Sequence, residues 1–137
     1  RQRQMCIRDR IGEPRMVRMD YDASGGREVF LSFEDENETL FGLLRMRVQS
    51  RLAEGNIAYI RELHIYGPEV PLSERKDGVA QHKGLGKALL REAERIAASE
   101  FQVRLMLVLS GVGAREYYRA ELGYRSQGDY MVKSLRA

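Results

Sequence analysis

The ten-residue stretch QHKGLGKALL at positions 81–90 constrains the fold of this chain more than any other. Gly84 and Gly86 stand directly before a helical pattern that runs to about Glu100. One helical face is apolar and the other charged: Leu85, Ala88, Leu89, Ala93, Ile96 and Ala97 against Lys87, Arg91, Glu94 and Arg95. The first N–H groups of a helix have no acceptor inside it and lie at the positive end of its dipole. Because glycine has no Cβ atom, a phosphate can approach these groups closely, so the stretch predicts a phosphate-binding loop.

The spacing of this loop differs from two common phosphate-binding motifs. A Walker loop has the pattern Gly-x-x-x-x-Gly-Lys-Ser/Thr, and a dinucleotide-binding fold has Gly-x-Gly-x-x-Gly after its first strand. Here the pattern is Gln-x-x-Gly-x-Gly after three predicted strands. It resembles the Gln/Arg-x-x-Gly-x-Gly/Ala signature of the GNAT acetyltransferases, whose loop holds the pyrophosphate of acetyl-CoA. A plain tight turn before a helix is the alternative, and the rest of the chain has to decide between them.

Residues 1–10 (RQRQMCIRDR) match the translation of a common transposase sequencing adapter over their whole length. We therefore expect this segment to be a disordered artefact, with a disordered basic arm as the alternative. It carries four arginines and one aspartate, which account for the whole net charge of +3. The remaining residues 11–137 are neutral overall, so the high isoelectric point does not indicate nucleic-acid binding. We expect residues 11–137 to form one domain, the C-terminal fragment of a longer enzyme.

Composition excludes several kinds of site and partner. The single cysteine, Cys6, lies in the adapter-like segment, and the two histidines are far apart in the sequence, so no disulfide or metal site is predicted. No apolar run reaches membrane-spanning length and no signal peptide is recognisable. The sequence therefore predicts a soluble cytoplasmic protein with no membrane partner.

The first half of the chain predicts an antiparallel meander. Residues 11–27 are expected to be irregular, with a turn at Ser24–Gly26, and three strands follow at residues 28–33, 40–48 and 57–66. Residues 34–38 are acidic and are expected to form a solvated hairpin tip. Along the third strand, Tyr59, Leu63 and Ile65 are expected to share one face.

The second half predicts one buried strand, a short helix and a last strand. Residues 67–80 form a long polar loop before the phosphate-binding stretch. Residues 104–110 are almost continuously apolar, which is typical of a central strand buried on both faces. A break at Gly111–Gly113 precedes a short helix at 114–122, which Gly123 ends. A turn at 126–129 leads to the last strand at 130–135.

Six segments extend the resemblance beyond the loop. They are IRELHIYG at 60–67, QHKGLG at 81–86, EAERIA at 92–97, SGVG at 110–113, REYYR at 115–119 and YMVK at 130–133. In this order they resemble the C-terminal GNAT acetyltransferase domain of the Elongator catalytic subunit, including its archaeal single-subunit forms. The resemblance covers about residues 20–137. It implies a GNAT α/β (α+β) fold: a mixed, mostly antiparallel sheet whose two central parallel strands splay apart.

The resemblance implies acetyl-CoA as cofactor, held between the splayed strands and the helix start. The cofactor-binding residues that it implies are Glu62, Leu63, His64, Ile65, Gln81, Lys83, Gly84, Leu85, Gly86, Lys87 and Tyr118. The strand residues offer backbone groups to the acetyl and pantetheine end. The loop residues offer N–H groups and lysine charges to the phosphates, with a solvated helix start as the alternative for the two lysines.

Tyr118 is the leading candidate for catalysis, as an acid that protonates the leaving thiolate of CoA, and Tyr117 is the second. Packing of the short helix is the alternative for both. Many relatives place the second tyrosine four residues before the glycine of a Gly-Tyr pair, whereas Tyr118 stands five residues before Gly123. The extra residue could rotate Tyr118. For Glu62, a general base and a strand ion pair with Arg45 or Arg61 both remain open.

The family modifies the wobble uridine of tRNA, so the resemblance implies the acetyl-CoA-binding domain of a tRNA uridine(34) acetyltransferase. It implies a radical-SAM domain upstream, which would hold the iron–sulfur cluster and S-adenosylmethionine and most of the tRNA contact. Elongator-like subunits or a second copy of the chain are further partners to consider. Two other functions remain open: a free-standing N-acetyltransferase for a protein or small molecule, and a non-catalytic CoA-binding docking module.

Overall fold

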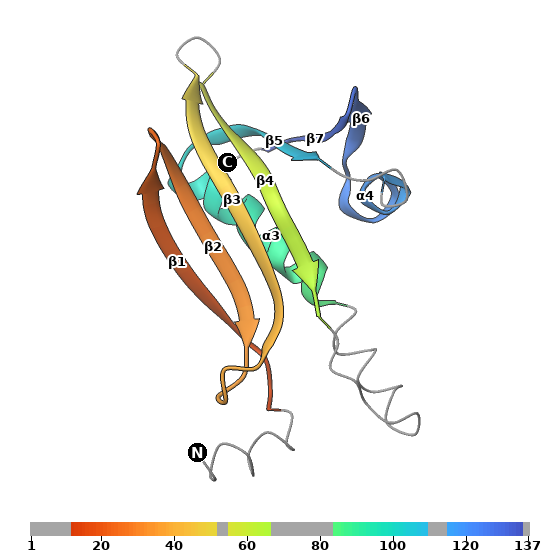
Figure 1. The fold of residues 1–137 in the computed structure, drawn as a ribbon. Helices are drawn as coiled ribbons and strands as arrows, with labels where there is room; N and C mark the ends of the chain where they lie inside the picture. The colour runs from red at the N-terminus through yellow and green to blue at the C-terminus, as the bar shows by residue number, and fades with distance from the viewer. Residues whose placement is uncertain (1–11, 52–54, 67–83, 110–114, 136–137) are drawn as a thin grey trace.

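The computed structural model describes residues 12–51, 55–66, 84–109 and 115–135 (Figure 1). The expectations for residues 1–10, the loop at 67–80, Gln81, Lys83 and the break at 111–113 lie outside these residues. For Tyr117 the backbone is described, as part of a helix, and the side chain is not.

The described strands form one seven-stranded sheet in the order β1-β2-β3-β4-β5-β7-β6. Their bounds are Arg15–Ala23 (β1), Gly26–Glu34 (β2), Leu40–Arg51 (β3), Gly55–Ile65 (β4), Val103–Leu109 (β5), Arg125–Gln127 (β6) and Tyr130–Ser134 (β7). Each neighbouring pair is antiparallel except β4 and β5, which are parallel. The predicted mixed, mostly antiparallel sheet is therefore confirmed.

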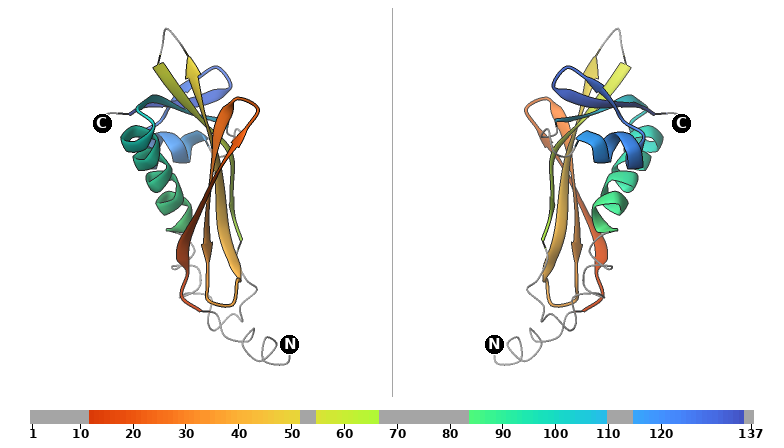
Figure 2. Two further views of the ribbon diagram at one scale, coloured as in Figure 1. Left: turned by 90° about the vertical axis from the view of Figure 1, so that its left-hand side faces the viewer. Right: turned by 90° about the vertical axis from the view of Figure 1, so that its right-hand side faces the viewer.

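Two helices lie on the same side of this sheet (Figure 2). The long helix α3 (Leu85–Glu100) matches the prediction closely, and α4 (Arg115–Leu122) ends before Gly123, whose φ is +81°. Fully buried residues of α3 pack on fully buried residues of the strands: Leu89, Leu90, Ala93, Ile96 and Ala97 against Leu31, Leu44, Met46, Ala58 and Met106. Burial of this apolar surface is the main stabilising term of the fold.

Strand β1 corrects the expectation that residues 11–27 are irregular. It pairs with β2 along its whole length, from Arg15 opposite Glu34 to Ala23 opposite Gly26. The turn at Ser24 and Gly25 has positive φ at both residues (+48° and +78°), as tight hairpins require. Since β1 is an edge strand with mostly exposed side chains, it lacks the apolar run that identifies a buried strand. At the other edge, β6 occupies part of the turn predicted at 126–129.

A β-bulge in β4 overturns the predicted face of Tyr59. Met46 of β3 lies opposite Ile60 and Arg45 lies opposite Glu62, so Arg61 is an extra residue. The extra residue reverses the alternation of side chains. Ile60 and Leu63 therefore both contribute to the core, together with their β3 partners, whereas Tyr59 pairs with Arg47 on the opposite face.

Strand β5 is buried on one face, and the prediction that both of its faces are buried is wrong. Met106 and Val108 are buried in the core cluster, but Leu109 is 65% exposed. Leu90 and Ile96 of α3 and Leu122 of α4 belong to the same core cluster as Met106, so the two described helices cover a single face of the strand.

Two acidic residues are more buried than the sequence indicates. Asp35, in the tip predicted to be solvated, accepts hydrogen bonds from the backbone N–H groups of Gly12, Asn37 and Thr39 at 3.1, 2.9 and 2.8 Å. Glu94, assigned to the charged face of α3, is 8% exposed. It stands four residues after Leu90 and three before Ala97, which places it on the buried face of the helix.

Candidate cofactor-binding site at the start of α3

The start of α3 presents the first backbone N–H groups of a helix, which suit an anion. Gly84 caps the helix with φ −88° and ψ −8°, and its carbonyl accepts from the Ala88 N–H at 3.0 Å. No side chain of the described residues caps this end, and the first turn holds no acidic residue. The N–H groups of Leu85, Gly86 and Lys87 belong to the first turn, where a helix supplies no acceptor. Together with the exposed Lys87, they make this end of α3 electropositive.

The two glycines keep the space beside this end open. A Cβ atom added at Gly84 would meet nothing within 4 Å among the described residues. One added at Gly86 would lie 3.4 Å from Cγ1 of Ile65, an ordinary contact. The structure therefore brings the glycine loop against the last residue of β4, and two parts of the predicted site meet.

Strands β4 and β5 separate near this point. They pair in parallel from Asn56 opposite Val103 to Ile60 opposite Val108, and β4 then continues to Ile65 without a β5 partner among the described residues. On its other edge the same segment stays paired with β3, with Leu43 opposite His64. The end of this pairing at Ile60 agrees with the predicted splay of the parallel strands. No described residue pairs with the backbone of residues 62–65 on the β5 side.

A hollow of about 450 Å³ lies where the two strands diverge. It is lined by residues of β3, β4, β5 and β7: Arg47, Gln49, Tyr59, Ile60, Arg61, Leu109 and Tyr130. Arg61, the bulge residue, and Leu109, at the exposed end of β5, both line the hollow. The hollow therefore opens on the sheet face away from the helices.

The predicted strand ion pair of Glu62 is present. The Glu62 carboxylate pairs with the Arg45 guanidinium opposite it, and both side chains are half-exposed. A hydrogen bond with Tyr21 raises the pKa of Arg45, and the charge of Glu62 adds to this. His64 Nε2 lies 3.9 Å from Glu62 Oε2, and its ring stacks on Tyr66 with centroids 6.2 Å apart. Glu62 as a general base stays a prediction.

Tyr118 lies in the hydrophobic core at 6% exposure. Its ring meets the ring of Tyr124 edge to face, with centroids 5.7 Å apart and an interplanar angle of 76°. The backbone N–H of Tyr124 also donates to the Tyr118 carbonyl at 3.0 Å. The catalytic role of Tyr118 stays a prediction, as does that of Tyr117.

A buried polar cluster on the same helix was missed at the sequence level. The Glu94 carboxylate accepts from the Tyr124 hydroxyl at 2.8 Å, from Lys133 Nζ at 3.1 Å and from Arg91 at 3.2 Å. The position of Glu94 between Leu90 and Ala97 is the signal that could have found it. Its partners Tyr124 and Lys133 are 30 and 39 residues away along the chain, which no local pattern indicates.

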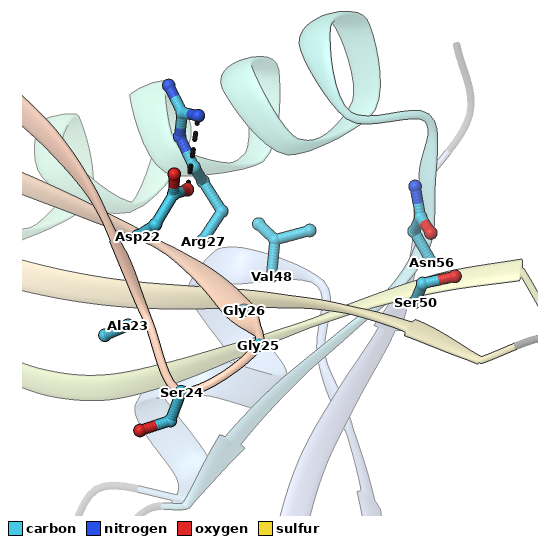
Figure 3. A pocket seen from close by; sticks show the side chains of 9 residues that line it. All are labelled: Asp22, Ala23, Ser24, Gly25, Gly26, Arg27, Val48, Ser50 and Asn56. Carbon is cyan, nitrogen blue, oxygen red and sulfur yellow. Dashed lines mark hydrogen bonds and ion pairs between the residues drawn. The ribbon is translucent and has the colours of Figure 1, made fainter.

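A second hollow, of about 460 Å³, is remote from this site (Figure 3). It lies under the β1–β2 turn and beside Asn56, at the first residues of β4, whereas Ile65 marks the other end. At ~3.3 Å per residue the two ends are ~30 Å apart. Small side chains and one ion pair, Asp22 with Arg27 at 3.4 Å, line it. It carries none of the predicted site residues.

Metal and membrane features were also sought in the described part of the chain. No group of three His, Cys, Asp or Glu side chains there could hold a metal ion. Nor does either described helix have the length and apolar character that crossing a membrane would need.

Comparison with known proteins places these features in a family. Residues 7–124 match the sequence profile of the Acetyltransferase (GNAT) family. The tRNA uridine(34) acetyltransferase of Dehalococcoides mccartyi is 50% identical over 131 residues, covering 90% of this chain and 28% of that protein. Elongator complex protein 3 of Mus musculus is 50% identical over 127 residues, covering 88% of this chain and 23% of that protein.

Solved structures agree. The archaeal Elongator protein of Methanocaldococcus infernus, solved with an N-terminal deletion, superposes with a TM-score of 0.73 at 44% identity, covering 90% of this chain and 30% of that one. A putative acetyltransferase of Pyrococcus furiosus, at 24% identity and a TM-score of 0.58, shares the fold. This chain spans about a quarter of the length of the curated relatives it matches. With its family profile matched over residues 7–124, the chain belongs to the GNAT acetyltransferases.

Proposed function

We propose that this chain is the acetyl-CoA-binding domain of a tRNA uridine(34) acetyltransferase of the Elongator type. The observation that carries the proposal is the backbone of residues 62–65, which has no partner on the β5 side among the described residues and ends at Ile65, beside Gly86 at the start of α3. The 50% identity with the Dehalococcoides mccartyi enzyme supports the choice of substrate.

The residues present fit acetyl-CoA. Its pantetheine arm carries amide groups, which pair with an open strand edge as an added strand does, and residues 62–65 supply such an edge. Its pyrophosphate is anionic and suits the electropositive start of α3, where the glycines leave room. We assign Gly84, Leu85, Gly86 and Lys87 to the pyrophosphate, and Glu62, Leu63, His64 and Ile65 to the pantetheine. Gln81 and Lys83 would add to the phosphate contacts.

Acetyl-CoA would supply an activated acetyl thioester at the open end of β4. The chain's own contribution is to hold the thioester in place along the backbone of residues 62–65. Tyr118 would hold a proton near the sulfur, which a leaving thiolate requires. The uridine chemistry, with its iron–sulfur cluster and S-adenosylmethionine, we assign to a radical-SAM domain. The relatives' additional length leaves room for such a domain, which would also provide most of the contact to tRNA in the cytoplasm.

The first test of this proposal is turnover of acetyl-CoA by the chain. Wild type should bind acetyl-CoA in a calorimetric titration and hydrolyse it slowly, with water taking the acetyl group as acetate and the release of free CoA thiol measured with and without tRNA. Tyr118→Phe should slow this release by about a hundredfold, because one positioned acid is lost, and should leave affinity nearly unchanged. A large loss in Tyr117→Phe alone would move the role to Tyr117. No loss in either would make both tyrosines structural, and no binding by wild type would contradict the proposal itself.

A second expectation concerns tRNA. Because residues 1–10 carry the whole net charge, a chain beginning at Ile11 should bind tRNA weakly and with a shallow dependence of affinity on salt. Filter binding at several salt concentrations, with the full chain as control, measures both quantities. Tight binding by the shortened chain at physiological salt would contradict the assignment of most tRNA contacts to another domain.

A further inference from the structure

The buried cluster around Glu94 joins three elements of the fold. Glu94 comes from the middle of α3, Lys133 from β7 and Tyr124 from the corner between α4 and β6. Lys133 Nζ also donates to the carbonyl of Leu122, the last residue of α4, at 3.1 Å. A cation at the end of a helix satisfies its open carbonyl groups and its negative dipole end. The cluster therefore fixes the end of α4 against α3.

A carboxylate inside an apolar helix face is costly unless it is well paired. Here two cations and one hydroxyl surround it, and Lys133 also lies over the Tyr124 ring, with Nζ 5.6 Å from the centroid. Burial, and then the charge of Glu94, raise the pKa of Tyr124. The Tyr124 hydroxyl thus keeps its proton and remains a donor to Glu94 at any physiological pH.

Tyr124 is in turn bound to Tyr118 by two contacts. One is the edge-to-face ring contact and the other is the hydrogen bond from the Tyr124 N–H to the Tyr118 carbonyl. In a common helix ending that bond spans five residues, whereas here it spans six. The extra residue before Gly123 is thereby taken up at the helix end, and Tyr118 stays bound to Tyr124.

The same helix carries the glycine loop. Gly86 stands eight residues before Glu94 on α3, a rise of ~12 Å. A chain of contacts consequently runs from the loop along a rigid helix to Glu94, then to Tyr124 and to the ring of Tyr118.

We infer that Glu94 is a positioning residue: through the Tyr124 hydroxyl it sets the place of the Tyr118 ring relative to the phosphate-binding start of α3. The inference rests on the proposed function, because the position of the Tyr118 ring affects turnover only if a thioester is bound near it. It predicts that Glu94 affects turnover without contacting acetyl-CoA.

The test uses the full chain with fluorotyrosine in place of tyrosine, so that the ring of Tyr118 is observed directly by fluorine NMR. Tyr118→Phe assigns its signal. Glu94→Gln keeps the shape of the side chain and removes its charge, and Tyr124→Phe keeps the ring and removes the hydroxyl. Glu92→Gln is the matched control, because Glu92 is on the same helix and pairs with Arg95 at 2.7 Å, outside the cluster. Thermal unfolding checks that each variant is folded.

We expect Glu94→Gln and Tyr124→Phe each to shift or broaden the Tyr118 signal, and Glu92→Gln to leave it in place. In CoA release, kcat should fall about tenfold in Glu94→Gln and in Tyr124→Phe, because each variant loses one charge-assisted hydrogen bond. The affinity for acetyl-CoA should stay within about twofold of wild type. The losses of kcat should vanish when Tyr118 is already Phe, because the ring position acts on turnover through the Tyr118 hydroxyl.

An unchanged Tyr118 signal in both variants overturns the inference. Equal losses of kcat with and without the Tyr118 hydroxyl overturn it too, because Glu94 would then act on folding alone. Failure of wild type to bind acetyl-CoA overturns the proposed function instead. In that event the fluorine signal still decides whether Glu94 positions Tyr118.

Discussion

Replacing Gly86 by Asp is expected to abolish acetyl-CoA binding. The new carboxylate would stand in the first turn of α3, where the proposed pyrophosphate accepts hydrogen bonds from backbone N–H groups. Two like charges 4 Å apart near a protein surface repel by about 4 kcal/mol, which is about a thousandfold in affinity. The fold should survive, because among the described residues a Cβ atom at this position meets Ile65 alone, at 3.4 Å. Calorimetric titration with acetyl-CoA measures the loss.

Gly86→Ala is the matched control for this variant. It adds the same Cβ atom without the charge, and alanine is favoured over glycine within a helix by about 1 kcal/mol. This variant should be at least as stable as wild type and should bind acetyl-CoA more weakly, but measurably. Equal affinities for wild type and Gly86→Asp would contradict the placement of the pyrophosphate at α3.

The helix α3 could be predicted because its signals are local. The two glycines stand at the helix start, and the apolar face repeats along the helix itself. The separation of β4 from β5 was expected only through the resemblance to a family. No local pattern shows where two strands stop pairing, because the pairing joins residues far apart in the sequence, such as Ile60 and Val108.

The failures of prediction come from contacts between distant parts of the chain. Strand β1 has Arg18 and Asp20 among its residues, and it is a strand because the tight turn at Ser24 pairs it with β2. The bulge at Arg61 appears only when β4 is aligned with β3. Glu94 is charged and was therefore assigned to solvent. Its burial depends on Tyr124 and Lys133, which the local pattern of α3 does not contain.

The largest expected effect on stability belongs to the ion pair of Arg47 with Glu28. Arg47 NH1 lies 2.7 Å from Glu28 Oε2, and their side chains are 11% and 5% exposed. The same guanidinium donates to the carbonyl groups of Ala23 and Ser24, each at 2.9 Å. Arg47 on β3 thus holds the β1–β2 hairpin in place. Through its hydrogen bonds it also satisfies carbonyls at the positive-φ turn.

Arg47→Met should lower the free energy of unfolding by about 3–5 kcal/mol, because it leaves the Glu28 carboxylate buried without its partner. For a chain of this size the loss corresponds to a fall in Tm of about 10–20 °C. Urea unfolding followed by circular dichroism measures the free energy of unfolding. Arg95→Met, which breaks a solvent-exposed pair on α3, is the control and should change nothing measurable.

The double variant Arg47→Met with Glu28→Gln separates charge from packing. If the uncompensated carboxylate causes the loss, removing its charge should restore a large part of the stability that Arg47→Met removes. Among the described side chains the nearest other cation is Arg61, whose NH1 lies 4.0 Å from Glu28 Oε2, and it is exposed enough to move closer in the single variant. Adding Arg61→Met to Arg47→Met should therefore deepen the loss. A double variant no more stable than Arg47→Met would show instead that the hydrogen bonds to the hairpin carbonyls, and not the buried charge, are what Arg47 contributes.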